Sequence, residues 1–189
     1  SGTVRTVYIH ADGRRVKELH FTTAFVRPDR FRFEYQDENP MGKPTRYIVW
    51  ASGDEVQTWW TVENEIKNQP SLSLALAGAT GVSAGSAHTV PRLLLPDDVD
   101  GWCTTKLIDV KLIGEGKVGE NECYRIEGKH PRVSRPRTLW IGREDYILRR
   151  IDEQKDIQDF RSETTTTYEP VINAEVTDEM LKFDPPEAK

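Results

Sequence analysis

The sequence predicts a mainly β (α+β) fold, in which a single strongly curved antiparallel sheet forms a half-barrel and a short helical insert covers its concave face. Runs of alternating apolar and polar residues follow one another along most of the chain, joined by short reversals. This order is typical of a meander rather than of βαβ units. Because strand twist accumulates across about ten strands, we expect the sheet to curl.

The first predicted strands begin at the N-terminus. Residues Val4 to Ile9 alternate, and their run ends at Asp12-Gly13, which is a strong hairpin signal. Side chains at alternate positions of Leu19 to Phe25 share one face of the next strand. The clearest pattern is Arg30 to Gln36, where aromatic residues alternate with charged or polar ones. This segment is predicted to be a half-buried strand, with Arg30 and Arg32 on its solvated face.

Two further strands and the helical insert follow. Tyr47 to Trp50 and Val56 to Trp60 are strand-like and flank a turn at Ser52-Gly53-Asp54. From Pro70 onward, leucines and alanines without a β-branched residue favour a short helix, Leu72 to Ala79. We therefore predict a helical lid at about residues 70–101.

The second half of the chain returns to strands. Five are predicted: Lys106 to Ile113, Glu122 to Gly128, Arg137 to Ile141, Tyr146 to Ile151 and Phe160 to Tyr168. Thr177 to Leu181 is predicted to form one helical turn with Thr177 as its cap. The insert is too short for a second domain, so we expect one domain over residues 1–189.

Composition and motifs exclude several classes of function. A net charge of -5, with 31 acidic against 26 basic residues, argues against a protein that neutralises many nucleic-acid phosphates. The longest weakly polar stretch, Ser71 to Leu95, is interrupted by glycine, proline, histidine and arginine, so we expect no transmembrane segment. Gly81 to Gly85 reads Gly-Val-Ser-Ala-Gly, the spacing of a nucleophile elbow, but no base for Ser83 is identifiable, so it is a poor nucleophile candidate. No phosphate loop or dinucleotide fingerprint is present, and the four histidines lack a metal-ligand spacing. We expect no catalytic activity, no cofactor and no metal site.

The two cysteines are predicted to be free thiols. Cys103 and Cys123 flank two predicted strands that reverse among Gly114, Gly116 and Gly119. In such a hairpin the residue opposite Cys123 lies near Lys111 to Gly116. Cys103 is then about 8 or more positions away along a strand that rises about 3.3 Å per residue. A disulfide needs Cα atoms within about 7 Å, so a bond between the two is not expected.

Several local motifs, taken in order, resemble the LolA/LolB-like superfamily of periplasmic lipoprotein carriers and outer-membrane lipoprotein-sorting relatives. The resemblance covers about residues 27–186. It depends on Arg27 to Phe33, Gly53 to Trp59, Leu139 to Ile141 followed by Tyr146 to Ile151, and Tyr168 to Asn173 followed by Phe183 to Pro186. Each motif alone has little specificity, and their order carries the resemblance.

The resemblance implies an unclosed barrel whose apolar concavity holds lipoprotein acyl chains beneath covering helices. It also implies a periplasmic or otherwise extracytoplasmic location. Members usually begin with an amphipathic helix, whereas this chain begins in a strand after Ser1-Gly2. That start is compatible with an N-terminal helix, targeting segment or anchor that has been removed.

The half-barrel prediction gives a set of candidate ligand-binding residues on the concave side: Phe21, Phe31, Phe33, Tyr35, Trp60, Leu72, Leu76 and Leu94. The alternative is that these side chains simply fill a core. Two functions remain open. The first is a carrier of a lipid, a lipoprotein acyl chain or another hydrophobic ligand. The second is a regulatory domain of the cell envelope that binds a protein partner. In either case we expect a monomer.

Overall fold

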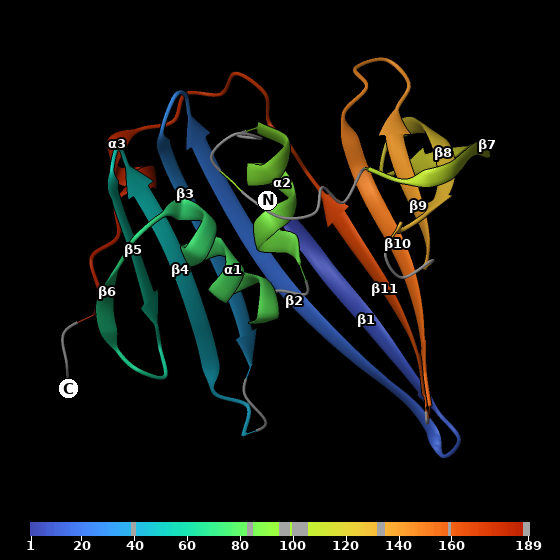
Figure 1. Cartoon of the computed structure of the whole chain (residues 1–189), viewed down its shortest axis with the longest axis horizontal. Helices are drawn as coiled ribbons and strands as arrows, with labels where there is room; N and C mark the ends of the chain where they lie inside the picture. The colour runs from blue at the N-terminus through green and yellow to red at the C-terminus, as the bar shows by residue number, and fades with distance from the viewer. Residues whose placement is uncertain are drawn as a thin grey trace. The chain divides into compact units, whose positions relative to one another are not determined.

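The computed structural model describes residues 1–38, 41–82, 85–94, 99, 106–131, 135–158 and 160–186. It contains eleven strands in one sheet and three short helices (Figure 1). The strands are β1 (Gly2–His10), β2 (Gly13–Val26), β3 (Arg30–Glu38), β4 (Pro44–Ser52), β5 (Glu55–Trp60), β6 (Glu65–Gln69), β7 (Ile108–Val118), β8 (Asn121–Lys129), β9 (Pro136–Gly142), β10 (Leu148–Ile157) and β11 (Phe160–Tyr168). The helices are α1 (Leu72–Val82), α2 (Ser86–Leu94) and α3 (Asp178–Leu181).

The strand order is β6-β5-β4-β3-β2-β1-β11-β10-β9-β8-β7. Two meanders, β2 to β6 and β7 to β11, are therefore joined by β1, which pairs with β11 in antiparallel register from Gly2↔Tyr168 to His10↔Phe160. Within the described residues no pairing joins β6 to β7, so the sheet is open. The prediction of a mainly β chain with one open antiparallel sheet and a short helical insert is confirmed.

The chain divides into two compact units. The first comprises Leu19–Gly101 and Val171–Lys189 together with Ser1, and the second comprises Gly2–Glu18 and Trp102–Pro170. Strand β2 contributes residues to both. The prediction of one domain over residues 1–189 stays a prediction.

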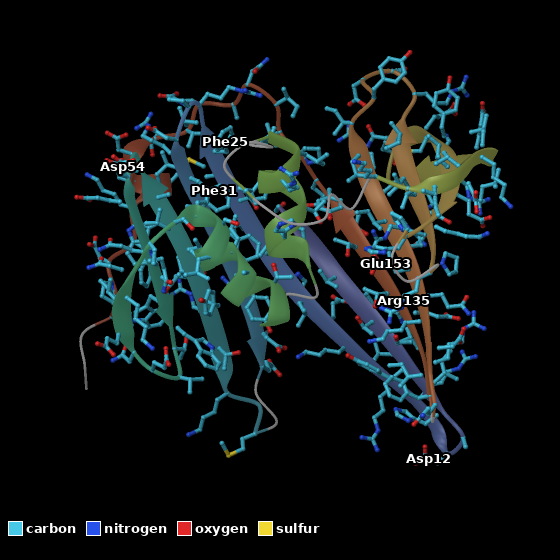
Figure 2. The ribbon with its side chains drawn as sticks, viewed as in Figure 1. Asp12, Phe25, Phe31, Asp54, Arg135 and Glu153 are labelled. Carbon is cyan, nitrogen blue, oxygen red and sulfur yellow. The ribbon has the colours of Figure 1, made fainter. Side chains whose placement is uncertain are left out.

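In the first unit, the strand register separates two faces of the sheet. Phe33 of β3 lies opposite Thr23 of β2 and Val49 of β4, and this side is the helix face. Helices α1 and α2 lie over it, in front of the strands in Figure 1. Figure 2 labels Phe31 and its cross-strand partner Phe25 near the turn between β2 and β3. The apolar core of the first unit therefore lies between α1, α2 and the helix face.

The other side of the same strands is the strap face, which carries Arg32, Glu34, Trp50 and Trp59. It is covered by the C-terminal strap, defined as residues 177–184, which contains α3. Residue Phe183 of the strap packs against both tryptophans. The prediction that Arg32 is solvated is wrong, because only 19% of its side chain is exposed and it pairs with Glu34.

The second unit has a smaller and more polar set of buried side chains. Val4, Leu139 and Ile151 are buried together with several hydroxyl-bearing residues of β1 and β11. These residues include Thr6, Ser162 and Thr166. Cys123 is a buried free thiol. It lies opposite Gly116, within the range predicted for its partner in the hairpin. Cys103 lies outside the described residues.

Strand β7, at one edge of the sheet, is irregular. Its register with β8 shifts between Ile108 and Lys111 and again between Leu112 and Gly114, and Asp109 has a φ of 53°. Three of its apolar side chains, Ile108, Val110 and Leu112, are exposed. Such bulges bend an edge strand and interrupt its row of free hydrogen-bonding groups.

Several boundaries differ from the prediction for local reasons. Strand β6 was missed because Glu65–Gln69 contains a single apolar residue, Ile66, and the strand follows a turn in which Asn64 has a φ of 51°. Helix α2 was missed because Pro91 lies inside it. Strand β10 begins at Leu148 rather than Tyr146, because Tyr146 has a φ of 57°. The single turn predicted at Thr177 to Leu181 is confirmed as α3, although Thr177 makes no side-chain cap.

Candidate functional site

The aromatic residues predicted on the concave side come together on the helix face of the first unit. Phe21, Phe31, Phe33 and Tyr35 are all buried, and Phe33 has no exposed surface. The rings of Phe21 and Phe33 stack with their centroids 6.1 Å apart. The hydroxyl of Tyr35 donates to Asp37 at 2.9 Å, and burial and this hydrogen bond raise the pKa of Tyr35. These four residues form the aromatic floor.

The cover over the aromatic floor is built mainly from small side chains. Ser71 begins α1 by accepting a hydrogen bond from the backbone N–H of Leu74 at 3.2 Å. Leu76 is fully buried, and the other buried positions of the two helices include Ala75, Ala79, Ala87 and Thr89. A Cβ atom on Gly78 would lie 3.2 Å from the hydroxyl oxygen of Tyr47, so α1 approaches β4 closely at this point. The predicted residues Leu72 and Leu94 are half-buried.

A cavity of about 280 Å³ lies beside this cover, and we call it the Trp60 cavity. It is lined by Tyr47, Thr58, Trp59, Trp60, Glu63, Glu65, Lys67 and Gln69. The rings of Tyr47 and Trp60 are tilted, with centroids 6.3 Å apart. Lys67 pairs with Glu63 at 2.8 Å at the exposed side. Burial raises the pKa of Tyr47, so its hydroxyl stays protonated over the physiological range. The cavity therefore combines an aromatic wall with a charged rim.

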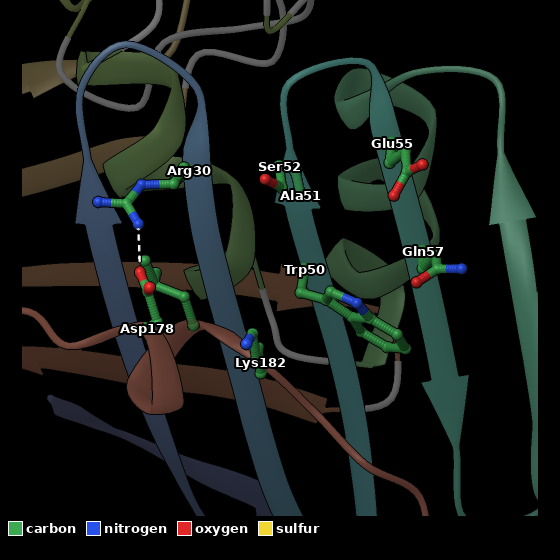
Figure 3. Close-up of a pocket in the computed structure, with 9 residues that line it drawn as sticks. Arg30, Trp50, Ala51, Ser52, Glu55, Gln57, Asp178 and Lys182 are labelled. Atoms are coloured by element: carbon green, nitrogen blue, oxygen red, sulfur yellow. Dashed lines mark hydrogen bonds and ion pairs between the residues drawn. The ribbon is translucent and has the colours of Figure 1, made fainter.

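A second cavity, of about 290 Å³, lies on the strap face, and we call it the Trp50 cavity (Figure 3). In Figure 3, α3 lies in front of the strands and the helices of the insert lie behind them. The lining includes Arg30, Trp50 and Glu55 from the strands, and Asp178 and Lys182 from the strap. Arg30 and Asp178 form an ion pair at 2.5 Å, which joins the two sides of the cavity.

The strap is attached to the sheet by one aromatic ring and several arginines. The ring of Phe183 lies 5.4 Å from that of Trp50 and 5.1 Å from that of Trp59, measured between centroids. The guanidinium groups of Arg32 and Arg46 each lie 5.7 Å from the centre of the Phe183 ring. Arg32 also donates to the backbone carbonyl of residue 182 at 2.6 Å. Aromatic and cation–π contacts thus hold the end of the strap.

Beneath the strap, the carboxylate of Glu34 organises the charged side chains. It accepts hydrogen bonds of 2.8 Å from Arg32, Gln36 and Arg46. Burial alone would raise the pKa of Glu34, but these hydrogen bonds and the charge of Arg46 outweigh it and hold the pKa below its ordinary value. Glu34 is therefore ionised in the folded chain near neutral pH.

Comparisons with known proteins find similarity among solved structures. The sequence matches no protein-family model, and no curated protein matches it. A structure of an uncharacterized conserved protein from Thermus thermophilus has a TM-score of 0.45 and 13% identity, covering 98% of this chain and 86% of the other. The structure of LprF from Mycobacterium bovis has a TM-score of 0.40 and 10% identity, covering 92% of this chain and 88% of LprF. The structure of a LolA superfamily protein from Nitrosomonas europaea has a TM-score of 0.34 and 10% identity, covering 96% of this chain and 89% of the other. The solved structures that this chain is similar to thus include one of a LolA superfamily protein, at low identity and a modest TM-score.

The structure brings most of the predicted site residues together. Phe21, Phe31, Phe33 and Tyr35 are buried on the helix face, Leu76 is buried in α1, and Trp60 lines the neighbouring cavity. Their role in ligand binding stays a prediction. Tyr47 was not predicted as a residue that lines the site. Its register opposite Tyr35 and Trp60 nevertheless follows once the hairpins are aligned. It also missed the Trp50 cavity, because nothing local to β3 or β4 indicates that the strap returns to them.

Among the described residues, no group of three or more histidine, cysteine, aspartate or glutamate side chains is arranged to hold a metal ion. None of the helices in the described part of the chain has the length and apolar character needed to cross a bilayer.

Proposed function

We propose that this chain is a non-catalytic extracytoplasmic binding protein that holds a lipid, a lipoprotein acyl chain or another hydrophobic ligand between the aromatic floor and helices α1 and α2. The observation that carries the proposal is the nature of the cover. Two helices of 11 and 9 residues, with alanine and glycine at their close contacts, lie over a layer of large aromatic side chains. The extracytoplasmic location rests on the sequence resemblance alone.

The energetics of such a cover favour exchange with a ligand. Helices shorter than about 12 residues are marginal in water and persist here through packing. Displacing them exposes apolar surface, at a cost of about 25 cal/mol per Å². A bound acyl chain would offset this cost, because each buried methylene contributes about 0.8 kcal/mol. The Trp60 cavity adjoins α1 through Tyr47 and offers the place where a chain would enter.

The test measures binding of a fluorescent fatty-acid probe to the delipidated full chain. We expect saturable binding, and about tenfold weaker binding for Trp60→Ala, since loss of one aromatic contact costs about 1.4 kcal/mol. Trp60 is half-buried, so its replacement leaves the packed floor intact. The matched control is Trp140→Ala, a half-buried strand tryptophan in the second unit, which should leave probe binding unchanged. Equal affinities for all three proteins would refute the proposal.

A second candidate function is a protein-interaction domain of the cell envelope with no lipid cargo. It is favoured by the complete burial of Phe33 and Leu76 and by the exposure of Leu74 and Leu93 on the outer side of the insert. Native mass spectrometry separates the two functions. A co-purified lipid mass supports the carrier, whereas a protein that stays at its own mass and binds no probe supports the interaction domain.

A further inference from the structure

We propose that the strap face is a docking groove for an acidic, phenylalanine-containing segment of a partner protein, and that the chain's own strap occupies this groove when the partner is absent. The strap groove is formed by Arg30, Arg32, Arg46, Trp50 and Trp59. It lies on the opposite side of the sheet from the aromatic floor. The inference therefore goes beyond the proposed function and does not depend on it.

Charge complementarity selects the class of partner. Three arginines of the groove face one buried carboxylate, Glu34, and the exposed Glu55 also lines the Trp50 cavity. The strap that covers them carries Asp178, Glu179 and Asp184 against one lysine. A basic groove is thus matched by an acidic segment, and removal of the strap would leave Arg30 without its carboxylate partner. The groove favours acidic segments over basic ones.

The aromatic contacts fix the spacing that such a segment needs. The strap places an acid at position 178 on Arg30, a leucine at 181 that is buried, and a phenylalanine at 183 between the two tryptophans. Arg32 contacts the strap through a backbone carbonyl, which any residue supplies. The recognised pattern is therefore an acid, a leucine three residues later and a phenylalanine two residues after that.

The strap is held in a way that permits exchange. Helix α3 is a single turn of 4 residues without a side-chain cap, and the preceding Val171 and Ile172 are exposed. A single helical turn that follows exposed residues opens locally at a lower cost than a core strand does. In addition, the buried indole N–H of Trp59 has no hydrogen-bond partner among the described atoms. A partner segment that offers an acceptor there would satisfy a group that the strap leaves unpaired.

The tether of the strap sets the conditions for exchange. A segment joined by a short flexible linker acts at an effective concentration on the order of 1 mM. A free peptide of the same sequence therefore competes poorly with the intact strap, and a partner must bind more tightly or be held nearby by other contacts. Weakening the strap should reveal the groove.

The experiment uses a fluorescent peptide with the sequence of residues 175–186 and the full chain in three forms: wild type, Phe183→Ala and Asp178→Asn. We expect Phe183→Ala to bind the peptide at least about tenfold more tightly than wild type does, with Asp178→Asn between them. A peptide in which alanine replaces the phenylalanine should not bind. Adding Arg30→Glu to Phe183→Ala should weaken binding, and a peptide with lysine at the position of Asp178 should restore it.

Three results would overturn the proposal. The first is an absence of peptide binding by Asp178→Asn and Phe183→Ala chains whose circular dichroism matches wild type. Asp178 is 65% exposed, so its replacement leaves the fold intact. The second is equal binding to all forms, or binding that Arg30→Glu does not change. The third is a stable dimer of wild-type chains that forms by exchange of straps, which would assign the groove to a second copy.

Discussion

In the first unit, the helix face packs large aromatic rings beneath small side chains of two helices, whereas the strap face holds a carboxylate and three arginines beneath one tethered ring. Phe33 and Glu34 are adjacent in β3 and point to these two faces. Apolar contacts on the helix face gain stability in proportion to the area removed from water, without directional demands. The strap face depends on specific partners, since each buried charge must be paired. One strand can therefore present two different sides. The packing of one side makes no directional demands, whereas the other side requires specific charged partners.

The largest expected effect tests the helix face. Replacing Phe33 with alanine should lower the free energy of unfolding by about 3–5 kcal/mol, because a fully buried ring is lost and a cavity remains. Urea denaturation followed by circular dichroism measures this change. A loss well below 1 kcal/mol would mean that the floor is loosely packed, and would favour an open ligand site over a filled core.

The second effect tests the paired carboxylate of the strap face. Glu34→Gln should lower stability by about 2 kcal/mol at neutral pH, since charge-assisted hydrogen bonds are weakened. The folded-state pKa of Glu34 is lowered, so its stabilisation is present above the ordinary glutamate pKa and is lost as pH falls through the folded value. The difference between wild type and variant should therefore shrink in acid. A difference that is constant with pH would contradict this assignment.

The third effect concerns the ring that anchors the strap. Phe183→Ala should cost about 1–2 kcal/mol, less than Phe33→Ala, because Phe183 is only half-buried. Its sharper signature is local. Hydrogen exchange of the strap should accelerate while that of β3 and β4 stays close to wild type. Faster exchange throughout the unit would show that the strap is part of one cooperative core.

The smallest effect concerns the exposed ion pair. Asp178→Asn should change global stability by less than about 1 kcal/mol, because both partners are partly or largely exposed and salt screens them. The same chain should still show a measurable rise in strap exchange at low salt. If high salt abolishes the difference from wild type, the pair contributes through charge alone.

The sequence allowed prediction of the elements whose signals are local. The alternation from Arg30 to Gln36 placed Phe31, Phe33 and Tyr35 on one face correctly, and the Gly53-Asp54 reversal is where β4 meets β5. Local patterns could not reveal β6, which has a single apolar residue, or α2, which contains a proline.

The candidate site could be predicted only in part. The alternating aromatic residues predicted a buried layer. Whether that layer accommodates a ligand depends on packing between segments that are distant in sequence. The strap groove could not be predicted for the same reason, since the contacting residues Phe183 and Trp50 are more than a hundred positions apart in the sequence. The last motif of the family resemblance contained Phe183, but nothing in it indicated which strands it covers.

The irregular edge strand β7 bears on how this chain behaves at high concentration. A straight edge with exposed Ile108, Val110 and Leu112 would be a template for intermolecular strand addition and, ultimately, fibril growth. Two register breaks and ion pairs such as Lys111 with Glu127 interrupt that template along its length. The distortion of β7 therefore disfavours intermolecular strand addition at a border that exposes three apolar side chains.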